Sequence, residues 1–266
     1  MSRAPQLALR VEGLGFAYGQ TPVLRDVTLP REARGVVGLL GPNGSGKSTL
    51  LRCVAGHLRP SGSVSVHDGG RPLTPSQLSA ALGYVPQDAP GDVALTVLET
   101  VLIGLRRRGG WRTSPEEAAR AVECLAELGV DHLADRFLGQ LSGGQRQLVG
   151  LAQMTVRAPK LMLLDEPTSA LDLRHQIRVL EYVTDRIRSR EGTALLALHD
   201  LNLAARFCDE LVILRDGRCA AMGPPAEILT PEVLESTYGV SARILDDDGV
   251  PVVSAHARSG ASAQGD

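Results

Sequence analysis

Short runs of apolar residues bounded by glycine and proline dominate the first part of the chain. The runs at 23–29 and 35–40 predict two strands, and the second leads directly into the glycine-rich segment 41–49. Beyond that segment, apolar residues recur at helical spacing: Leu50, Leu51, Val54, Ala55 and Leu58. The pattern predicts a strand, a loop and a helix, in that order.

The segment from about 88 to 157 has helical periodicity and few strand signals. Its clearest helix begins at 114–117, where a serine N-cap, a proline and a capping-box glutamate follow one another. We expect this helix to end at Gly129. Its predicted buried face consists of Ala121, Val122, Leu125 and Leu128. The segment therefore predicts an inserted helical subdomain.

Alternation of strands and helices resumes after this insertion. The continuous apolar runs at 161–164 and 194–198 predict strands covered on both faces, and the helical spacing between them predicts a right-handed crossover. Residues 211–223 predict a hairpin that turns at Asp216 and Gly217. We expect short helices over 226–238 and a disordered tail from about 259.

Composition excludes several classes of protein. The 266 residues are 43% hydrophobic with a net charge of -2, which excludes a disordered chain and gives no electrostatic indication of a nucleic-acid partner. No apolar run approaches the roughly 18 residues of a membrane span. The N-terminus lacks the apolar core of a signal peptide, and the four cysteines are far apart, as expected in a reducing compartment. We therefore expect any membrane role to depend on a partner.

The glycine-rich segment matches the P-loop pattern G-x-x-x-x-G-K-[ST] between a predicted strand and a predicted helix. Its glycines let backbone amides converge on one point at a helix N-terminus, where polyphosphate binds. Only Lys47 and Lys160 are lysine among 28 basic residues. A lysine at this position of the motif therefore indicates that the chemistry of the site requires lysine rather than arginine. Ser48 offers a hydroxyl to Mg²⁺. The predicted phosphate site comprises Gly41, Pro42, Asn43, Gly44, Ser45, Gly46, Lys47, Ser48 and Thr49.

An acidic pair follows the apolar run at 161–164. Asp165 is at the position expected for a second group that contacts Mg²⁺, in addition to Ser48. Glu166 is expected to orient or deprotonate an attacking water. A solvated strand end is the alternative interpretation of such a pair.

A second loop also opens a predicted helix, at Leu141-Ser-Gly-Gly-Gln145. Ser142 is a suitable N-cap without any ligand. Two successive glycines at a helix start, however, favour close approach of another group to the backbone. The sequence thus predicts two helix ends of the type that binds phosphate.

These motifs, in this order and followed by His199, resemble the ATP-binding subunits of ABC transporters over roughly residues 7–240. The resemblance implies an α/β P-loop NTPase fold: a mostly parallel sheet with an antiparallel β N-terminal part and an inserted α-helical subdomain. It implies one ATP-binding domain over 1–240, a C-terminal extension over 241–266, and ATP hydrolysis with Mg²⁺. In this family two subunits pair head to tail, which would place four residues of one copy over the ATP of the other: Ser142, Gly143, Gly144 and Gln145.

The resemblance also implies roles for single residues. Tyr18 would stack on adenine, although a half-buried strand tyrosine is the alternative. Gln87 would reach Mg²⁺ and water, so that Ser48, Gln87 and Asp165 form the metal site. Asp172 would communicate across the dimer, or else simply cap the next helix. His199 would contact the γ-phosphate.

The segments 165–176 and 199–206 are similar to those of ATPases of iron-siderophore, haem and cobalamin importers. This similarity implies an ATPase at the cytoplasmic face of the membrane. Its partners would be a second copy or close paralogue, permease subunits and, indirectly, a substrate-binding protein, with no nucleic acid. The favoured cargo is a ferric siderophore. Residues 96–105 with Gln87 would pass motion to a permease helix, and an amphipathic core helix is the other interpretation of that stretch. Haem or cobalamin import and a soluble single-cassette ATPase of cofactor assembly stay open.

Overall fold

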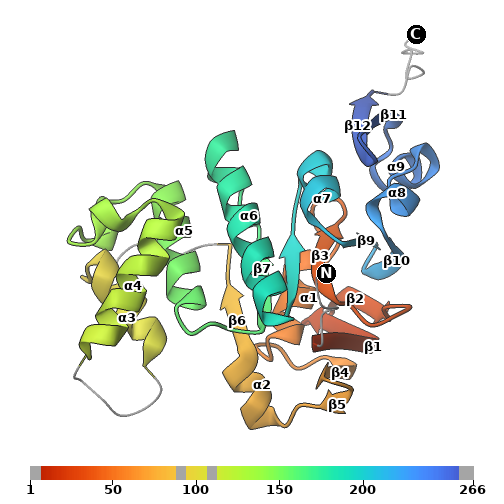
Figure 1. The fold of residues 1–266 in the computed structure, drawn as a ribbon. Coiled ribbons are helices and arrows are strands. Elements are labelled where there is room, and N and C mark those ends of the chain that lie inside the picture. The colour runs from red at the N-terminus through yellow and green to blue at the C-terminus, as the bar shows by residue number, and fades with distance from the viewer. Residues whose placement is uncertain (1–6, 88–93, 107–112, 258–266) are drawn as a thin grey trace. The chain divides into compact units, whose positions relative to one another are not determined.

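A computed structural model of the chain describes residues 7–87, 94–106 and 113–257 (Figure 1). The chain divides into two compact units. The helical unit contains Met1–Ala8 and Val66–Leu196, and the P-loop unit contains Leu9–Ser65 and Ala197–Asp266. The predicted tail from 259 lies outside the described residues.

The P-loop unit begins with an antiparallel hairpin of β1 (Leu7–Tyr18) and β2 (Thr21–Val27), beside β4 (Ser61–Asp68). Strand β3 (Gly35–Leu40) runs parallel to β9 (Glu210–Arg215) and leads into α1 (Lys47–Val54). Further along the chain are α7 (Leu201–Phe207), β10 (Arg218–Gly223), α8 (Pro225–Ile228), α9 (Pro231–Tyr238), β11 (Ser241–Asp247) and β12 (Val250–His256).

The helical unit contains the parallel strands β6 (Leu82–Val85) and β7 (Leu161–Asp165), with β8 (Thr193–Ala197) next to β7. Between β6 and β7 the chain forms α3 (Val97–Leu105), α4 (Pro115–Leu128) and α5 (Gly143–Thr155), which pack against one another. The remaining elements are β5 (Arg71–Pro72), α2 (Pro75–Ala81), the 3-10 turns Asp131–Leu133 and Leu138–Gln140, and α6 (Leu173–Arg190).

The predicted fold class is confirmed. Every residue of β7 and β8 is buried, as the continuous apolar runs require. Ser114 caps α4 through a capping box, and the hairpin of β9 and β10 turns at Asp216 and Gly217, which both have positive φ. The division into a 1–240 domain and an extension remains a prediction.

Two details of the sequence prediction are wrong. Val122 is 43% exposed, and Cys124 is buried in its place, because the stripe of α4 is centred on positions 121, 124, 125 and 128. The helix after the P-loop ends at Val54, so Leu58 lies beyond it, after the turn at Gly56.

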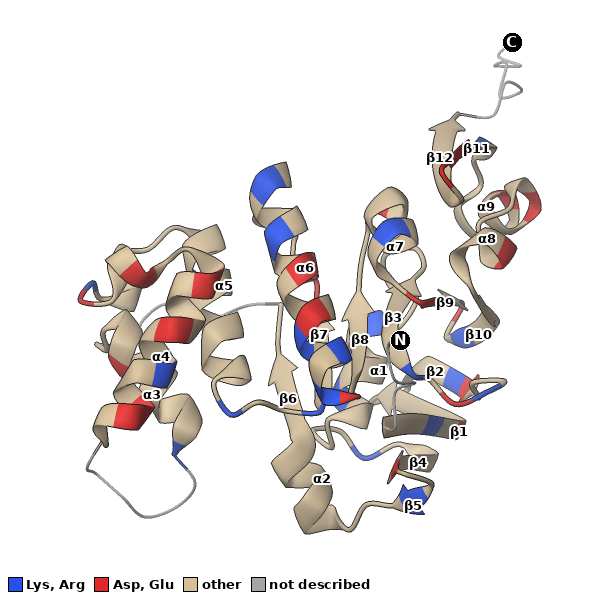
Figure 2. Ribbon diagram, in the orientation of Figure 1, with Lys and Arg blue, Asp and Glu red and all other residues tan. Residues whose placement is uncertain are grey.

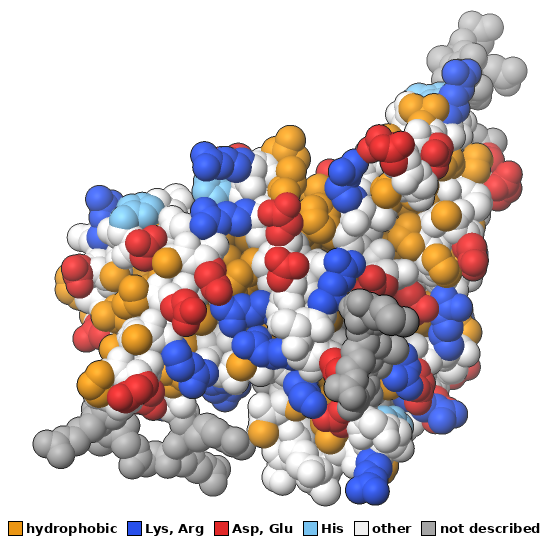
Figure 3. Space-filling view, viewed as in Figure 1, with side chains coloured by type: hydrophobic (Ala, Val, Ile, Leu, Met, Phe, Trp, Pro, Cys, Tyr) orange, Lys and Arg blue, Asp and Glu red, His pale blue; other side chains and the backbone are white. Residues whose placement is uncertain are grey.

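The sequence did not predict the antiparallel pair of β11 and β12, which packs on α7 and α9 within the P-loop unit. None of the helices within the described ranges is both long and apolar enough to cross a membrane. Basic and acidic residues both occur along α6 (Figure 2), and the two signs are interspersed on the face shown in Figure 3.

Helix α4 allows a matched test of its packing. Leu125→Ala should lower the free energy of unfolding by about 2–5 kcal/mol, because it leaves a cavity at a fully buried position. Val122→Ala, one turn away and exposed, should change it by less than about 0.5 kcal/mol. Urea denaturation followed by circular dichroism measures both, and equal losses would contradict the buried face described for α4.

Candidate nucleotide-binding and hydrolysis site

The P-loop follows β3, and its first glycine has a steric reason. Gly41 has φ 144°, and a Cβ atom there would lie 2.1 Å from the carbonyl oxygen of Leu214. Only glycine therefore lets the chain leave β3 in this direction. Gly44, with φ 79°, has no atom within 4 Å of an added Cβ, so this part of the loop has an open side.

Lys47 is the first residue of α1, and its ammonium group turns back into the loop. The Nζ atom donates to the carbonyl oxygens of Gly41 at 2.7 Å and Pro42 at 3.2 Å, and the residue is only 6% exposed. A buried ammonium group is costly unless hydrogen-bond acceptors surround it. The loop thus holds a fixed positive charge at the beginning of the helix.

The N-terminus of α1 adds to this positive potential. Its N-cap is Gly46, so no side chain caps the first amides, and its first turn has no acidic residue. The positive end of the helix dipole is therefore left without a carboxylate from the first turn. Together with Lys47, these amides fit the phosphates of a nucleotide.

Tyr18 and His199 lie in the same unit as the P-loop. Tyr18 is 46% exposed at the end of β1, with its ring edge-to-face to Phe16 at 5.0 Å. Strand β2, the partner of β1, packs on α1 and lies beside its start, since a Cβ atom on the N-cap Gly46 would lie 2.7 Å from the Leu24 side chain. An exposed ring there is available for stacking on a base.

His199 is exposed, just after the end of β8. The preceding Leu198 donates its backbone N–H to Leu39 of β3 at 3.1 Å. Since β3 leads into the P-loop two residues later, His199 and the P-loop leave the sheet at the same edge. Asp200 then caps α7, because its Oδ1 accepts from the amides of Asn202 at 2.8 Å and Leu203 at 2.9 Å.

The helical unit brings the acidic pair and Gln87 together. Strands β6 and β7 are parallel with Val85 opposite Leu164, so the residues after them meet at one edge. Gln87 Nε2 donates to Glu166 Oε2 at 2.9 Å. Asp165 is fully buried, whereas Glu166 is partly exposed.

Glu166 has an unusual backbone conformation. Its φ is 52°, in the left-handed region that costs a residue with a Cβ atom roughly 1–2 kcal/mol. Two side chains hold the carbonyl oxygen of Glu166 in place: Gln147 Nε2 donates at 2.6 Å and Ser169 Oγ at 3.1 Å. Residues held in such conformations cluster at active sites.

Gln147 is a further residue of this site, which the sequence did not predict. Gln147 is 7% exposed and lies on α5, the helix that Leu141-Ser-Gly-Gly-Gln145 opens, so its side chain ties this helix to Glu166. The available signal was a polar residue next to Leu148 on the predicted apolar face.

Ser142 and Gln145 form a capping box. The amide of Gln145 donates to Ser142 Oγ at 3.2 Å, and the amide of Ser142 donates to Gln145 Oε1 at 3.0 Å. The expected N-cap is therefore confirmed. A Cβ on Gly144 would lie 2.7 Å from the Ala170 carbonyl oxygen, so packing within the unit explains that glycine, whereas one on Gly143 would meet nothing closer than 4.0 Å.

Asp172 is exposed and caps α6 as expected, and its role across a dimer remains a prediction. Its Oδ1 accepts from the His175 backbone amide at 2.9 Å and lies 2.7 Å from His175 Nδ1. The backbone hydrogen bond, followed by the side-chain one, lowers the pKa of Asp172.

The expected site residues thus fall into two groups. The P-loop unit holds Tyr18, the loop of residues 41–49 and His199. The helical unit holds Gln87, Ser142–Gln145, Asp165, Glu166 and Asp172.

Residues 24–169 match the family described as ABC transporter. The chain is 43% identical over 248 residues to the hemin import ATP-binding protein HmuV of Bradyrhizobium diazoefficiens, with 88% of this chain and 90% of that one covered. It is 37% identical over 257 residues to the ferric enterobactin transport ATP-binding protein FepC of Escherichia coli, with coverage of 92% and 93%.

A solved structure of a metal-chelate type ABC transporter in an inward-facing conformation superposes with a TM-score of 0.77. Its sequence is 30% identical, over 94% of this chain and 97% of that chain. The chain belongs to the ABC transporter family. It is an ATP-binding subunit of the ABC type and an ATP hydrolase.

The two lysines of the chain provide a matched test of the phosphate site. Lys47→Ala should raise the Kd for ATP about 10- to 100-fold, since loss of a charged hydrogen bond costs about 1.5–3 kcal/mol. Lys160→Ala removes only a partly exposed ion pair with Asp68 and should leave the Kd within about twofold. Titration with a fluorescent ATP analogue measures both, and unchanged binding by Lys47→Ala would refute the phosphate site.

Proposed function

We propose that this chain is the ATP-hydrolysing subunit of an ABC importer for a ferric siderophore or a related metal chelate. The observation that carries the proposal is the hydrogen bond between Gln87 and Glu166. Gln87 directly follows Pro86, which lines a cleft between β6, α3 and α5. The hydrogen bond joins the residue assigned to hydrolysis to the loop that follows β6. The named relatives handle hemin and ferric enterobactin, which are both iron chelates.

The nucleotide site is proposed to hold Mg²⁺ with the ATP phosphates. The amides at the start of α1 and Lys47 would hold the phosphates, and Ser48, Gln87 and Asp165 would hold the metal. A hydroxyl, an amide oxygen and a carboxylate are the hard oxygen donors that Mg²⁺ prefers. When bound, Mg²⁺ neutralises charge on the phosphate oxygens.

Glu166 is proposed to be the general base. Its Oε2 accepts a hydrogen bond from Gln87 Nε2, which fixes the direction of the carboxylate. Glu166 would take a proton from water as the water oxygen attacks the γ-phosphorus and the bond to the β–γ bridging oxygen breaks. His199 would donate a hydrogen bond to the γ-phosphate.

Two copies are proposed to pair head to tail around two ATP molecules. The open space at Gly143 and the exposed position of Ser142 leave the start of α5 accessible to an anion. ATP on the P-loop of the other copy would supply that anion, and hydrolysis would remove it. ATP binding would then close the dimer, and hydrolysis would reopen it.

Glu166→Gln tests the general base. This variant should still bind ATP but lose about 10²- to 10⁴-fold in turnover, because an amide takes up no proton from water. It should accumulate as an ATP-bound dimer in size-exclusion chromatography with light scattering. Glu191→Gln is the control, since Glu191 also has a positive φ of 53° but caps α6. Near-normal phosphate release by Glu166→Gln would exclude Glu166 as the base.

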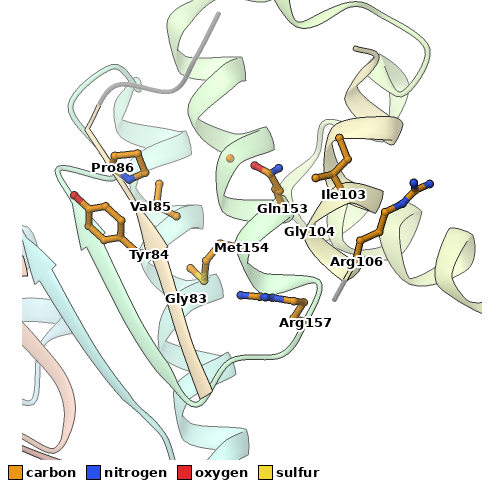
Figure 4. Close-up of a pocket in the computed structure, with 11 residues that line it drawn as sticks. Gly83, Tyr84, Val85, Pro86, Ile103, Gly104, Arg106, Gln153, Met154 and Arg157 are labelled. Carbon is orange, nitrogen blue, oxygen red and sulfur yellow. The ribbon is translucent and has the colours of Figure 1, made fainter. Parts of the chain in front are cut away.

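The permease is proposed to dock in a cleft of about 280 Å³ between β6, α3 and α5 (Figure 4). One wall is β6 with Tyr84 and Val85, and the other is α3 with Ile103 and Arg106. Met154 lines it from α5, and Arg157 lines it from the turn just after that helix. Apolar side chains beside two arginines suit an amphipathic helix that carries a carboxylate. Gln87 directly follows Pro86 of this cleft and hydrogen-bonds to Glu166, which would connect docking of the permease to hydrolysis.

Two exposed apolar residues test this docking surface. Ile103 is 42% exposed in the cleft and Val122 is 43% exposed on α4, outside it. Ile103→Arg should reduce recovery of permease in a membrane pull-down at least about tenfold, because it places a third cation in the cleft and blocks an apolar contact. Val122→Arg should recover permease normally.

The same pull-down tests the function. Recovery of wild-type chain with polytopic permease subunits is the expected result. Recovery with soluble scaffold proteins alone would contradict transport and favour the ATPase of cofactor assembly. The chain would act at the cytoplasmic face of the membrane.

Haem is the second candidate cargo, because the identity to the hemin relative is 43%, against 37% to the ferric enterobactin relative. The cargo contacts belong to the permease and its substrate-binding protein. Uptake of iron supplied as a siderophore or as haem, in cells with and without the chain, separates the two.

A further inference from the structure

The motif at 199–206 contains two residues that the proposed function leaves unexplained, Asn202 and Arg206. Both lie on α7, the helix that begins directly after His199 and Asp200. Both point to the C-terminal hairpin of β11 and β12. Arg206 forms an ion pair with Asp247 at 2.6 Å, with both side chains more than half exposed.

Asn202 makes the more specific contact. Its Oδ1 accepts from the backbone N–H of Val253 at 2.7 Å, and its Nδ2 donates to the carbonyl oxygen of the same residue at 3.4 Å. Val253 pairs with Ile244 of β11 on its other side. In an antiparallel pair, alternate residues direct both backbone groups away from the partner strand. The Asn202 amide thus takes the place of a neighbouring strand at Val253.

The contact between Asn202 and Val253 lies in a packed part of the P-loop unit. The Val253 side chain is almost fully buried, and β12 packs on both α7 and α8. Two side chains thereby hold the first turn of α7: Asp200 caps its amides, and Asn202 ties it to β12. His199 immediately precedes this turn, so its backbone position depends on it.

The same C-terminal segment also reaches the P-loop. Arg215 Nη1 donates to the carbonyl oxygen of Ser236 at 3.0 Å, which ties β9 to α9. Tyr238, at the end of α9, hydrogen-bonds to the backbone of Gly41, whose carbonyl accepts from Lys47. Burial raises the pKa of Tyr238 to about 12, although the Gly41 contact opposes this, so its hydroxyl stays neutral.

We propose that the C-terminal hairpin β11–β12 positions His199 for hydrolysis, and that Asn202 is the positioning residue that links the two. This inference rests on the proposed role of His199 at the γ-phosphate. Its physical basis is that a first turn held by two side chains keeps the residues before it in one arrangement, which lowers the cost of organising the transition state.

Asn202→Ala should lower kcat about fivefold, the effect of losing one or two hydrogen bonds that organise the site, with KM for ATP and Kd for the analogue within about twofold. Amide exchange over residues 201–207 should become faster in the nucleotide-free protein. Asn202→Asp retains the acceptor of the 2.7 Å bond and should keep most of the activity. Arg206→Ala, which removes only the exposed ion pair, is the matched control and should behave like wild type.

A double-mutant cycle separates positioning from general destabilisation. In a His199→Ala background, Asn202→Ala should cause no further loss of kcat, whereas losses that multiply would contradict action through His199. Unchanged kcat and unchanged exchange in Asn202→Ala would overturn the inference while leaving the proposed function intact. Full activity of His199→Ala alone would instead remove the assigned role of His199.

Discussion

A buried ammonium group inside a turn of glycines is the constraint on which the nucleotide site depends. The Lys47 side chain is tied to the carbonyl oxygens of Gly41 and Pro42. That arrangement requires a loop that leaves β3 where only glycine fits, and it places a fixed charge beside uncapped helix amides. The loop directs the first amides of α1 and the Lys47 ammonium group toward the same position. A polyphosphate is the ligand that satisfies these donors.

In the helical unit, hydrogen bonds likewise stabilise an unfavourable arrangement, at Glu166. Its left-handed backbone is unfavourable, and hydrogen bonds from Gln147 and Ser169 stabilise it, while Gln87 orients its carboxylate. Gln147 belongs to the helix opened by Ser142, so a single side chain links α5 to the backbone of the proposed base. Glu166 is thus held by side chains from other segments of the chain. In the P-loop unit, Asn202 ties β12 to the helix that follows His199, and Tyr238 hydrogen-bonds to the backbone of Gly41.

Local signals in the sequence predicted much of this molecule. The serine–proline–glutamate start of α4, the buried runs of β7 and β8, the turn at Asp216 and the P-loop depend on neighbouring residues or on simple periodicity, and the structure has them all. What escaped prediction depends on distant partners. Gln147 is explained by Glu166, and the hairpin β11–β12 by α7 and α9, neither of which its own sequence reveals. Val122 was misplaced because spacing alone does not fix the centre of an apolar stripe.

The central claim is that ATP on one P-loop is enclosed by the start of α5 from a second copy. Asn43→Cys combined with Gly143→Cys tests it directly, since Asn43 is exposed and an added Cβ at 143 meets no atom closer than 4.0 Å. In a Glu166→Gln background, mild oxidation should give disulfide-linked dimers with ATP and few without it. Absence of the cross-linked dimer in the presence of ATP, or equal cross-linking without nucleotide, would contradict the account.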